Sequence, residues 1–275
     1  MLNALRDGFA SLKTRPPLVS VLRLNGAIGG AGFGRGLTDA ALAPLVERAF
    51  APRRLAAVAL SINSPGGSPV QSALIAARIR RKAEEKSVPV IAFCEDVAAS
   101  GGYWLATAAD EIYADDNSIV GSIGVIYAGF GFHALLERQG VERRVHTAGR
   151  SKSLLDPFRP EKPEDVERIV SLQTVIHENF ITQVKSRRGA RLPEGTDLFT
   201  GDIWVGRQAV DVGLVDGLGH LVPVMKARFG EKIRFSVISP KRGFLQRLGA
   251  PGVEESFAAA GRVIEERALF ARYGL

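Results

Sequence analysis

The sequence predicts an α/β fold built on a largely parallel sheet. Short apolar runs rich in β-branched residues alternate with longer segments whose apolar residues recur at helical spacing. The 275 residues are 46% apolar and 24% charged, values typical of a soluble globular protein. We expect one domain over residues 18–240, an N-terminal segment over 1–17 and an amphipathic helical tail over 241–275.

The predicted strands are apolar runs bounded by turn residues. In chain order they are Leu18–Leu24, Leu55–Ile62, Val88–Cys94, Glu111–Ala114, Ile119–Tyr127, Val141–Thr147 and Ile233–Ile238.

The predicted helices begin at recognisable start signals. Thr38 caps a helix that Pro52 ends, and Ser68 caps one that continues to about Lys86. Pro163 opens the longest helix, which ends at Gly189 after two arginines, as the helix dipole favours. The other predicted helices are Ala98–Ala109, Phe132–Gln139, Gly206–Val212 and Leu221–Phe229.

Charge and apolar runs limit the classes of partner. Lys and Arg exceed Asp and Glu by 36 − 29 = 7, which suits a nucleic acid, an anionic membrane surface or no specific partner. The basic clusters lack interleaved aromatic residues, so we expect no nucleic-acid partner. No apolar run is long enough to span a membrane, and residues 1–17 lack an apolar signal core. We therefore expect a cytoplasmic location, with a peripheral position at a membrane surface as the alternative.

Ser100 is the candidate nucleophile for acyl transfer. That chemistry needs an exposed nucleophile, a base within reach and amide donors for the developing oxyanion. Ser100 follows a predicted strand, begins a predicted helix and has small neighbours in Ala98–Trp104. The alternative is that Ser100 merely caps a glycine-containing helix.

The other two requirements also have candidates. Gly66 and Gly67 follow a predicted strand and allow the backbone to approach a ligand closely, although this motif taken alone favours an ordinary Pro-Gly turn. Lys152 is the candidate base, since an apolar site favours the neutral amine of a lysine; the alternative is a surface lysine in a basic loop. No Cys, His or Asp cluster has metal-ligand spacing, so we predict no metal and no cofactor.

Five segments resemble, in order, the landmarks of the signal peptide peptidase A (SppA)/SohB-like serine peptidases of the ClpP/crotonase superfamily. The resemblance covers roughly residues 18–229. It implies a ClpP/crotonase-like fold with repeated β-β-α units, and a serine endopeptidase that acts on unfolded or signal-peptide-like peptides. The matching segments are Ile62–Gly67, Ala98–Trp104, Gly121–Val125, Gly149–Lys152 and Gly213–Asp216.

The resemblance also implies a role for each candidate residue. Ser100 matches the nucleophile and Lys152 the general base, a variant of the Ser-His-Asp arrangement. Ser122 matches a serine that orients the lysine, and Gly66, Gly67 and the amide of Gly101 match the oxyanion hole. In relatives of this size the serine and the lysine come from neighbouring protomers, so we expect a homo-oligomeric ring with shared sites.

Three alternatives remain open at this stage. A ClpP-type Ser-His-Asp protease would need a histidine about 25 residues after Ser100, and Gly121–Gly129 has none; His146 is then the next candidate base. A crotonase-like acyl-CoA enzyme shares an ending like Ala209–Asp216 but needs neither Ser100 nor Lys152. A catalytically silent scaffold on membranes would hydrolyse no peptide.

Overall fold

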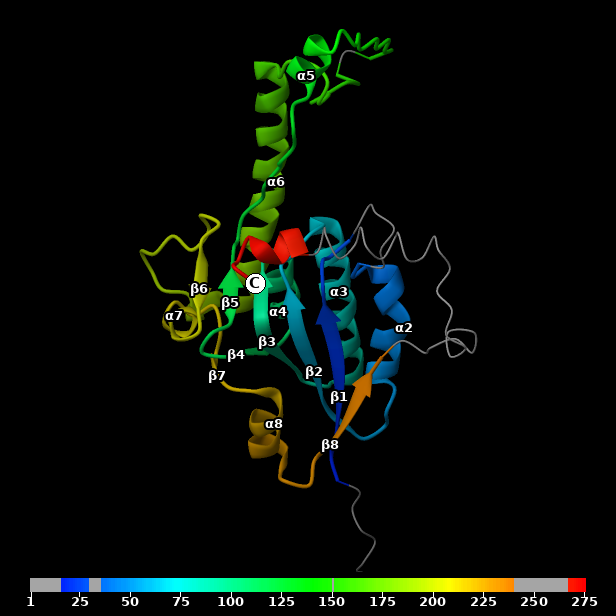
Figure 1. Ribbon diagram of the computed structural model, residues 1–275. Helices are drawn as coiled ribbons and strands as arrows, with labels where there is room; N and C mark the ends of the chain where they lie inside the picture. The colour runs from blue at the N-terminus through cyan, green and yellow to red at the C-terminus, as the bar shows by residue number, and fades with distance from the viewer. Residues whose placement is uncertain (1–15, 30–35, 150, 240–266) are drawn as a thin grey trace, which may run out of the picture.

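The computed structural model confirms an α/β fold around an eight-stranded sheet (Figure 1). The strand order is β6-β5-β3-β2-β1-β8, with β4 paired to β3 and β7. Every pairing is parallel except that between β5 and β6. The structure describes residues 16–29, 36–149, 151–239 and 267–275.

The elements have the following bounds. The strands are β1 (Leu18–Asn25), β2 (Leu55–Ser64), β3 (Val90–Ala99), β4 (Glu111–Ala114), β5 (Ile119–Gly121), β6 (Ile203–Val205), β7 (Gly217–Leu218) and β8 (Arg234–Ile238). The helices are α2 (Asp39–Phe50), α3 (Pro69–Lys86), α4 (Gly101–Ala106), α5 (His133–Arg138), α6 (Pro163–Arg188), α7 (Arg207–Asp211) and α8 (Leu221–Phe229), with a 3-10 turn at Gly189–Arg191.

Several predicted boundaries were wrong. Val141–Thr147 forms no strand, because it is mostly exposed and none of the described strands pairs with it to complete a backbone ladder. The strand predicted over Ile119–Tyr127 stops at Gly121. The helix predicted to begin at Ala98 begins at Gly101, because β3 continues to Ala99.

The terminal segments are covered only in part. Most of the N-terminal segment predicted over 1–17 lies outside the described residues, and so does the tail predicted over 241–275 up to residue 266. Within the tail, residues 267–271 are helical.

The sheet buries both of its faces. One face carries residues such as Leu22, Leu60 and Ile62, and α2 and α3 cover it. The opposite face carries Val21 and Phe93, which belong to a second apolar cluster with α8. Burial on both faces explains why the central strands read as continuous apolar runs in the sequence.

Helix α6 projects from this body (Figure 1). Its C-terminal half packs through Phe180 and Val184, which are buried, whereas Val170 and Val175 in its N-terminal half are exposed. Residues 124–175, called the arm below, comprise this projecting half, α5 and the segments that connect them. No helix within the described ranges combines the length and the apolar character that crossing a bilayer requires.

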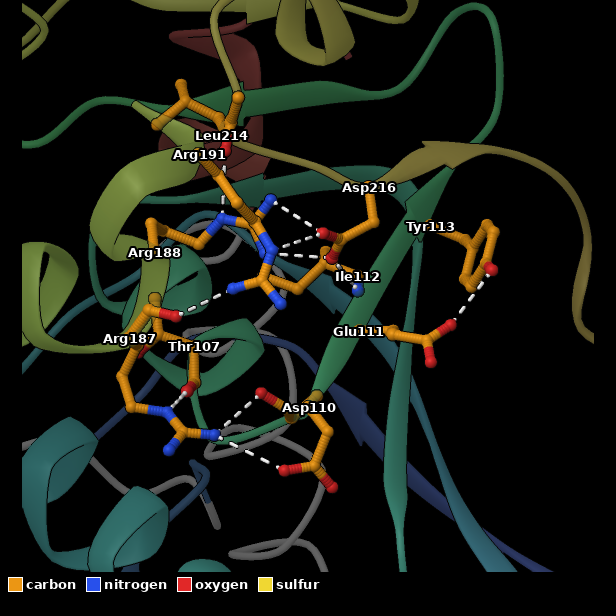
Figure 2. A network of polar contacts seen from close by, with 12 residues as sticks. Thr107, Asp110, Glu111, Ile112, Tyr113, Arg187, Arg188, Arg191, Leu214 and Asp216 are labelled. Atoms are coloured by element: carbon orange, nitrogen blue, oxygen red, sulfur yellow. Dashed lines mark hydrogen bonds and ion pairs between the residues drawn. The ribbon is translucent and has the colours of Figure 1, made fainter. Parts of the chain in front are cut away.

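An ion pair fixes the base of α6 (Figure 2). The Arg188 guanidinium is 2% exposed and donates to both carboxylate oxygens of Asp216, at 2.8 and 3.1 Å, and to Gly213 O at 2.9 Å. Asp216 also accepts from Ile112 N at 2.7 Å and pairs with Arg191 at 3.0 Å. One carboxylate therefore joins α6, β4 and the turn before β7.

Asp216→Ala is expected to lower the free energy of unfolding by about 3–5 kcal/mol, because it leaves the buried Arg188 guanidinium without a carboxylate to balance its charge. Urea unfolding followed by circular dichroism measures the change. The matched control is Glu142→Ala, which removes an exposed ion pair with Arg144 and should change stability by less than about 1 kcal/mol. Equal effects of the two substitutions would contradict this role for the pair.

Candidate active site

Ser100 occupies a strained turn between β3 and α4. Its backbone angles, φ of 51° and ψ of −123°, lie in a region that residues other than glycine rarely adopt. Two backbone bonds hold the turn: Ser100 N donates to Gly121 O at 2.8 Å, and Ser100 O accepts from Trp104 N at 3.0 Å. The surrounding structure therefore imposes this conformation on the serine.

Helix α4 holds that turn through its buried aromatic residues. Tyr103 is fully buried and its hydroxyl donates to Leu214 O at 2.7 Å. Trp104 stacks on Phe180 of α6 with ring centroids 4.9 Å apart. The segment that carries Ser100 is thus fixed to both the body and the base of the arm.

The loop after β2 lies directly against Ser100. A Cβ atom on Gly66, which has a φ of 101°, would lie 2.8 Å from both Ser100 Cβ and Gly101 N. A Cβ on Gly67 would collide with Ile28 O. Only glycine fits at these two positions, so the predicted close approach of the backbone is a feature of the structure.

Two amide groups beside Ser100 lack acceptors. Among the described residues, neither Gly67 N nor Gly101 N has a hydrogen-bond partner. Gly66 N, by contrast, donates to Ser64 Oγ at 3.3 Å. Gly67 and Gly101 are therefore better placed than Gly66 to offer donors to an oxyanion.

Ser122 lies in the next segment and is also strained, with a φ of 50°. Its N–H donates to Asp202 O at 2.7 Å, and the following carbonyl, Ile123 O, accepts from His177 Nε2 at 3.0 Å. Gly121 O accepts the hydrogen bond from Ser100 N, so Ser122 directly follows the residue that fixes the backbone of Ser100. Residue type gave no signal for Asp202, because it acts through its backbone carbonyl.

Lys152 is separated from the other predicted site residues. It is exposed in the turn 151–155 between α5 and α6, and Figure 1 shows α5 and the start of α6 at the end of the arm away from the sheet. Leu155 N in this turn donates to Asp165 of the first turn of α6 at 3.4 Å. Among the described residues, α6 bonds to the segment that follows Ser122 at His177, 177 − 165 = 12 residues later, or about 18 Å along the helix. One chain therefore does not bring Lys152 to Ser100.

Other candidate groups are poorly placed. His146 is exposed in the arm, and the strand predicted to carry it is absent. Burial raises the pKa of the Cys94 thiol to about 12, which keeps it protonated and unreactive. Within the described residues, no three His, Cys, Asp or Glu side chains gather where a metal ion could bind.

Gly66→Ala is expected to slow covalent labelling of Ser100 by a fluorophosphonate probe about tenfold or more, because the added methyl group meets Ser100 Cβ. Gly140→Ala is the matched control: Gly140 also has a positive φ, of 65°, but nothing lies within 4 Å of its added Cβ. It should cost only about 1–2 kcal/mol of stability and leave labelling unchanged. Equal labelling of both variants would show that Gly66 does not shape the site.

The sequence of this chain matches a known protein family. The model of peptidase family S49 matches residues 82–228. A Brucella melitensis protein named Na(+)/H(+) antiporter NhaA is 49% identical over 281 residues, which is 97% of this chain and 38% of that protein. The serine protease SPPA, chloroplastic, of Arabidopsis thaliana is 35% identical over 170 residues, 62% of this chain and 25% of that protein. The chain thus spans about two fifths or less of these relatives.

A solved structure has the same fold. The 1510-N membrane-bound stomatin-specific protease, solved as a mutant with a substrate peptide, aligns with a TM-score of 0.50 and 13% identity. The alignment covers 89% of this chain and 99% of that one, and confirms the ClpP/crotonase-like fold. Since the family model matches more than half of the sequence, this chain belongs to peptidase family S49, with the SppA- and SohB-like proteins.

Proposed function

We propose that this chain is a serine endopeptidase that hydrolyses unfolded or signal-peptide-like substrates with Ser100 as nucleophile. The observation that carries the proposal is the strained Ser100 beside the amides of Gly67 and Gly101, to which no other described residue offers an acceptor. A nucleophile held next to preorganised amide donors meets two of the requirements of acyl transfer. Membership of family S49, and relatives named as proteases, support a peptide bond as the substrate.

The proposed reaction has two steps. Ser100 Oγ attacks the scissile carbonyl carbon while neutral Lys152 Nζ takes its proton, and the Gly67 and Gly101 amides bind the oxyanion. Lys152 then gives that proton to the leaving amine, which leaves an ester on Ser100. A water molecule, deprotonated by Lys152, hydrolyses the ester and restores Ser100. Ser122 is proposed to orient the lysine.

We propose that Lys152 acts on Ser100 of a neighbouring protomer in a homo-oligomeric ring. The support is that the turn 151–155, which carries Lys152, bonds to the first turn of α6 at the distal end of the arm, whereas Ser100 lies between β3 and α4 in the body of the same chain. An arm that extends from one body can carry its lysine to the next body. Each site is then incomplete in one chain and complete in the assembly.

The apolar surface of the arm supports the same assembly. Phe130 is 81% exposed and lies 6.2 Å from Phe132, which lies 5.7 Å from Phe158, as measured between ring centroids. A continuous exposed aromatic cluster is typical of a protein interface. The other exposed large apolar residues of the arm are Ile126, Tyr127, Leu135, Val141, Val170, Leu172 and Val175. We propose that a second copy of the chain covers this surface.

Ser100→Ala and Lys152→Ala are each expected to lower the rate of casein hydrolysis by about three decades or more, because the two groups act as a unit. Lys162→Ala is the matched control, since Lys162 is another exposed arm lysine and its loss should leave the rate unchanged. Activity that survives Ser100→Ala, together with binding of coenzyme A, would favour the crotonase-like alternative.

Mixed assemblies test whether sites are shared. Ser100→Ala and Lys152→Ala chains, denatured together and refolded in equal amounts, should recover about one quarter of native activity. That fraction reflects random pairing around a ring in which one chain donates Ser100 and its neighbour donates Lys152. Replacing the Lys152→Ala chain by one that carries both substitutions should abolish recovery. No recovery in assemblies verified to be mixed would rule out shared sites.

A further inference from the structure

We propose that Asn63 is a positioning residue that fixes Ser100 relative to the glycine loop. Asn63 is the penultimate residue of β2, and the loop that carries Gly66 and Gly67 begins just after it. Its side chain bonds to the part of β3 that leads into Ser100. The inference rests on the proposed function, because the turnover it predicts is that of Ser100.

The pairing of β2 with β3 is irregular at this point. The register is regular from Val58 opposite Val90 to Ile62 opposite Cys94, and then jumps to Ser64 opposite Ala98. Between the last two pairs, β2 has one residue, Asn63, whereas β3 has the three residues 95–97. The extra residues form a bulge that ends three residues before Ser100. A bulge re-aims the strand beyond it, and here that strand carries the nucleophile.

The side chain of Asn63 makes two hydrogen bonds to residues of the bulge. Its Nδ2 donates to Asp96 Oδ2 at 2.6 Å, and its Oδ1 accepts from Val97 N at 3.3 Å. Its backbone carbonyl accepts from Gly26 N at 2.9 Å, so the end of β1 is tied to the same point. An amide is the uncharged group of this size that both donates and accepts, and both capacities are used here.

This contact spans the two segments whose separation sets the geometry of the site. The glycine loop leaves the sheet after β2, and Ser100 leaves it after β3, so an error at the bulge shifts Ser100 Oγ relative to Gly67 N. A misplacement of about 1 Å between reacting groups can reduce a rate about a hundredfold. The side chain of Ser61, two residues earlier on β2, donates to the side chain of Glu95 and makes no hydrogen bond to the backbone of the bulge.

An exchange of donor and acceptor tests the inference. Asn63→Asp places two carboxylates against each other and should lower kcat about 10–100-fold, with KM changed less than about threefold. Asp96→Asn keeps an amide-to-amide bond and should have a small effect. The double variant Asn63→Asp/Asp96→Asn rebuilds the bond with its roles exchanged, and should restore kcat to within about threefold of native.

Ser61→Ala is the matched control and should leave kcat within about threefold of native. Hydrogen exchange of the Val97 amide, measured in all variants, reports the bulge independently of turnover: it should accelerate in Asn63→Asp and return toward native in the double variant. Native kcat in Asn63→Asp, or no recovery in the double variant, overturns the inference while the peptidase function stands. If the native chain cleaves nothing, the proposed function fails, and exchange that is the same in all variants overturns this inference as well.

Discussion

The buried ion pair between Arg188 and Asp216 fixes the arm relative to the segment that carries Ser100. Arg188 is the last residue of α6, and Asp216 ends the Gly213–Asp216 turn that the sequence singles out. In the same turn, Leu214 O accepts from the hydroxyl of Tyr103 in α4, the helix that follows Ser100. A buried pair of this kind contributes little net stability compared with apolar packing, but it demands one arrangement of its partners. The direction of the arm and the position of Ser100 therefore have a common reference point.

Strained backbone conformations in the described residues lie mainly at or near the proposed catalytic residues. Four residues other than glycine have a positive φ among those described: Ser87, Ser100, Ser122 and Leu155. Ser87 ends α3, whereas the other three lie at the proposed nucleophile, beside it, and in the turn that carries Lys152. Each such conformation costs about 1–3 kcal/mol and persists because surrounding hydrogen bonds enforce it. At Ser100 and Ser122, those bonds come from Gly121 and Asp202.

The sequence predicts well what depends on local pattern. The strand over Leu55–Ile62 and the helix from Pro69 to Lys86 were predicted almost to the residue, because burial on both faces and a capped start are readable from neighbouring residues. The strand predicted over Val141–Thr147 was wrong, and β6 and β7 were missed, since a short strand exists only where a partner strand supplies its ladder.

In the site too, features set by neighbouring residues were predicted, and features that depend on distant segments were not. Ser100 and the glycines were found from their local context, and the structure places them together. The bulge held by Asn63 was not predicted, because a register jump involves two strands. The roles of Ser100, Lys152, Ser122 and the glycines stay predictions, and the separation of Lys152 from Ser100 follows only from the path of the arm.

A small tilt at the base of a long projecting helix produces a large displacement at its far end. The 26 residues of α6 span about 39 Å, so a tilt of about 3° at its base moves the far end by about 2 Å. That displacement exceeds the tolerance of a proton transfer between Lys152 and a neighbour's Ser100. Thermal motion of an unrestrained arm would therefore prevent the proposed proton transfer. Both ends of the arm need restraint, one from Arg188 and the other from the body of the neighbouring protomer in the proposed ring. In the proposed ring the next body supplies that second restraint, so on this proposal peptide hydrolysis begins only once neighbouring chains have assembled.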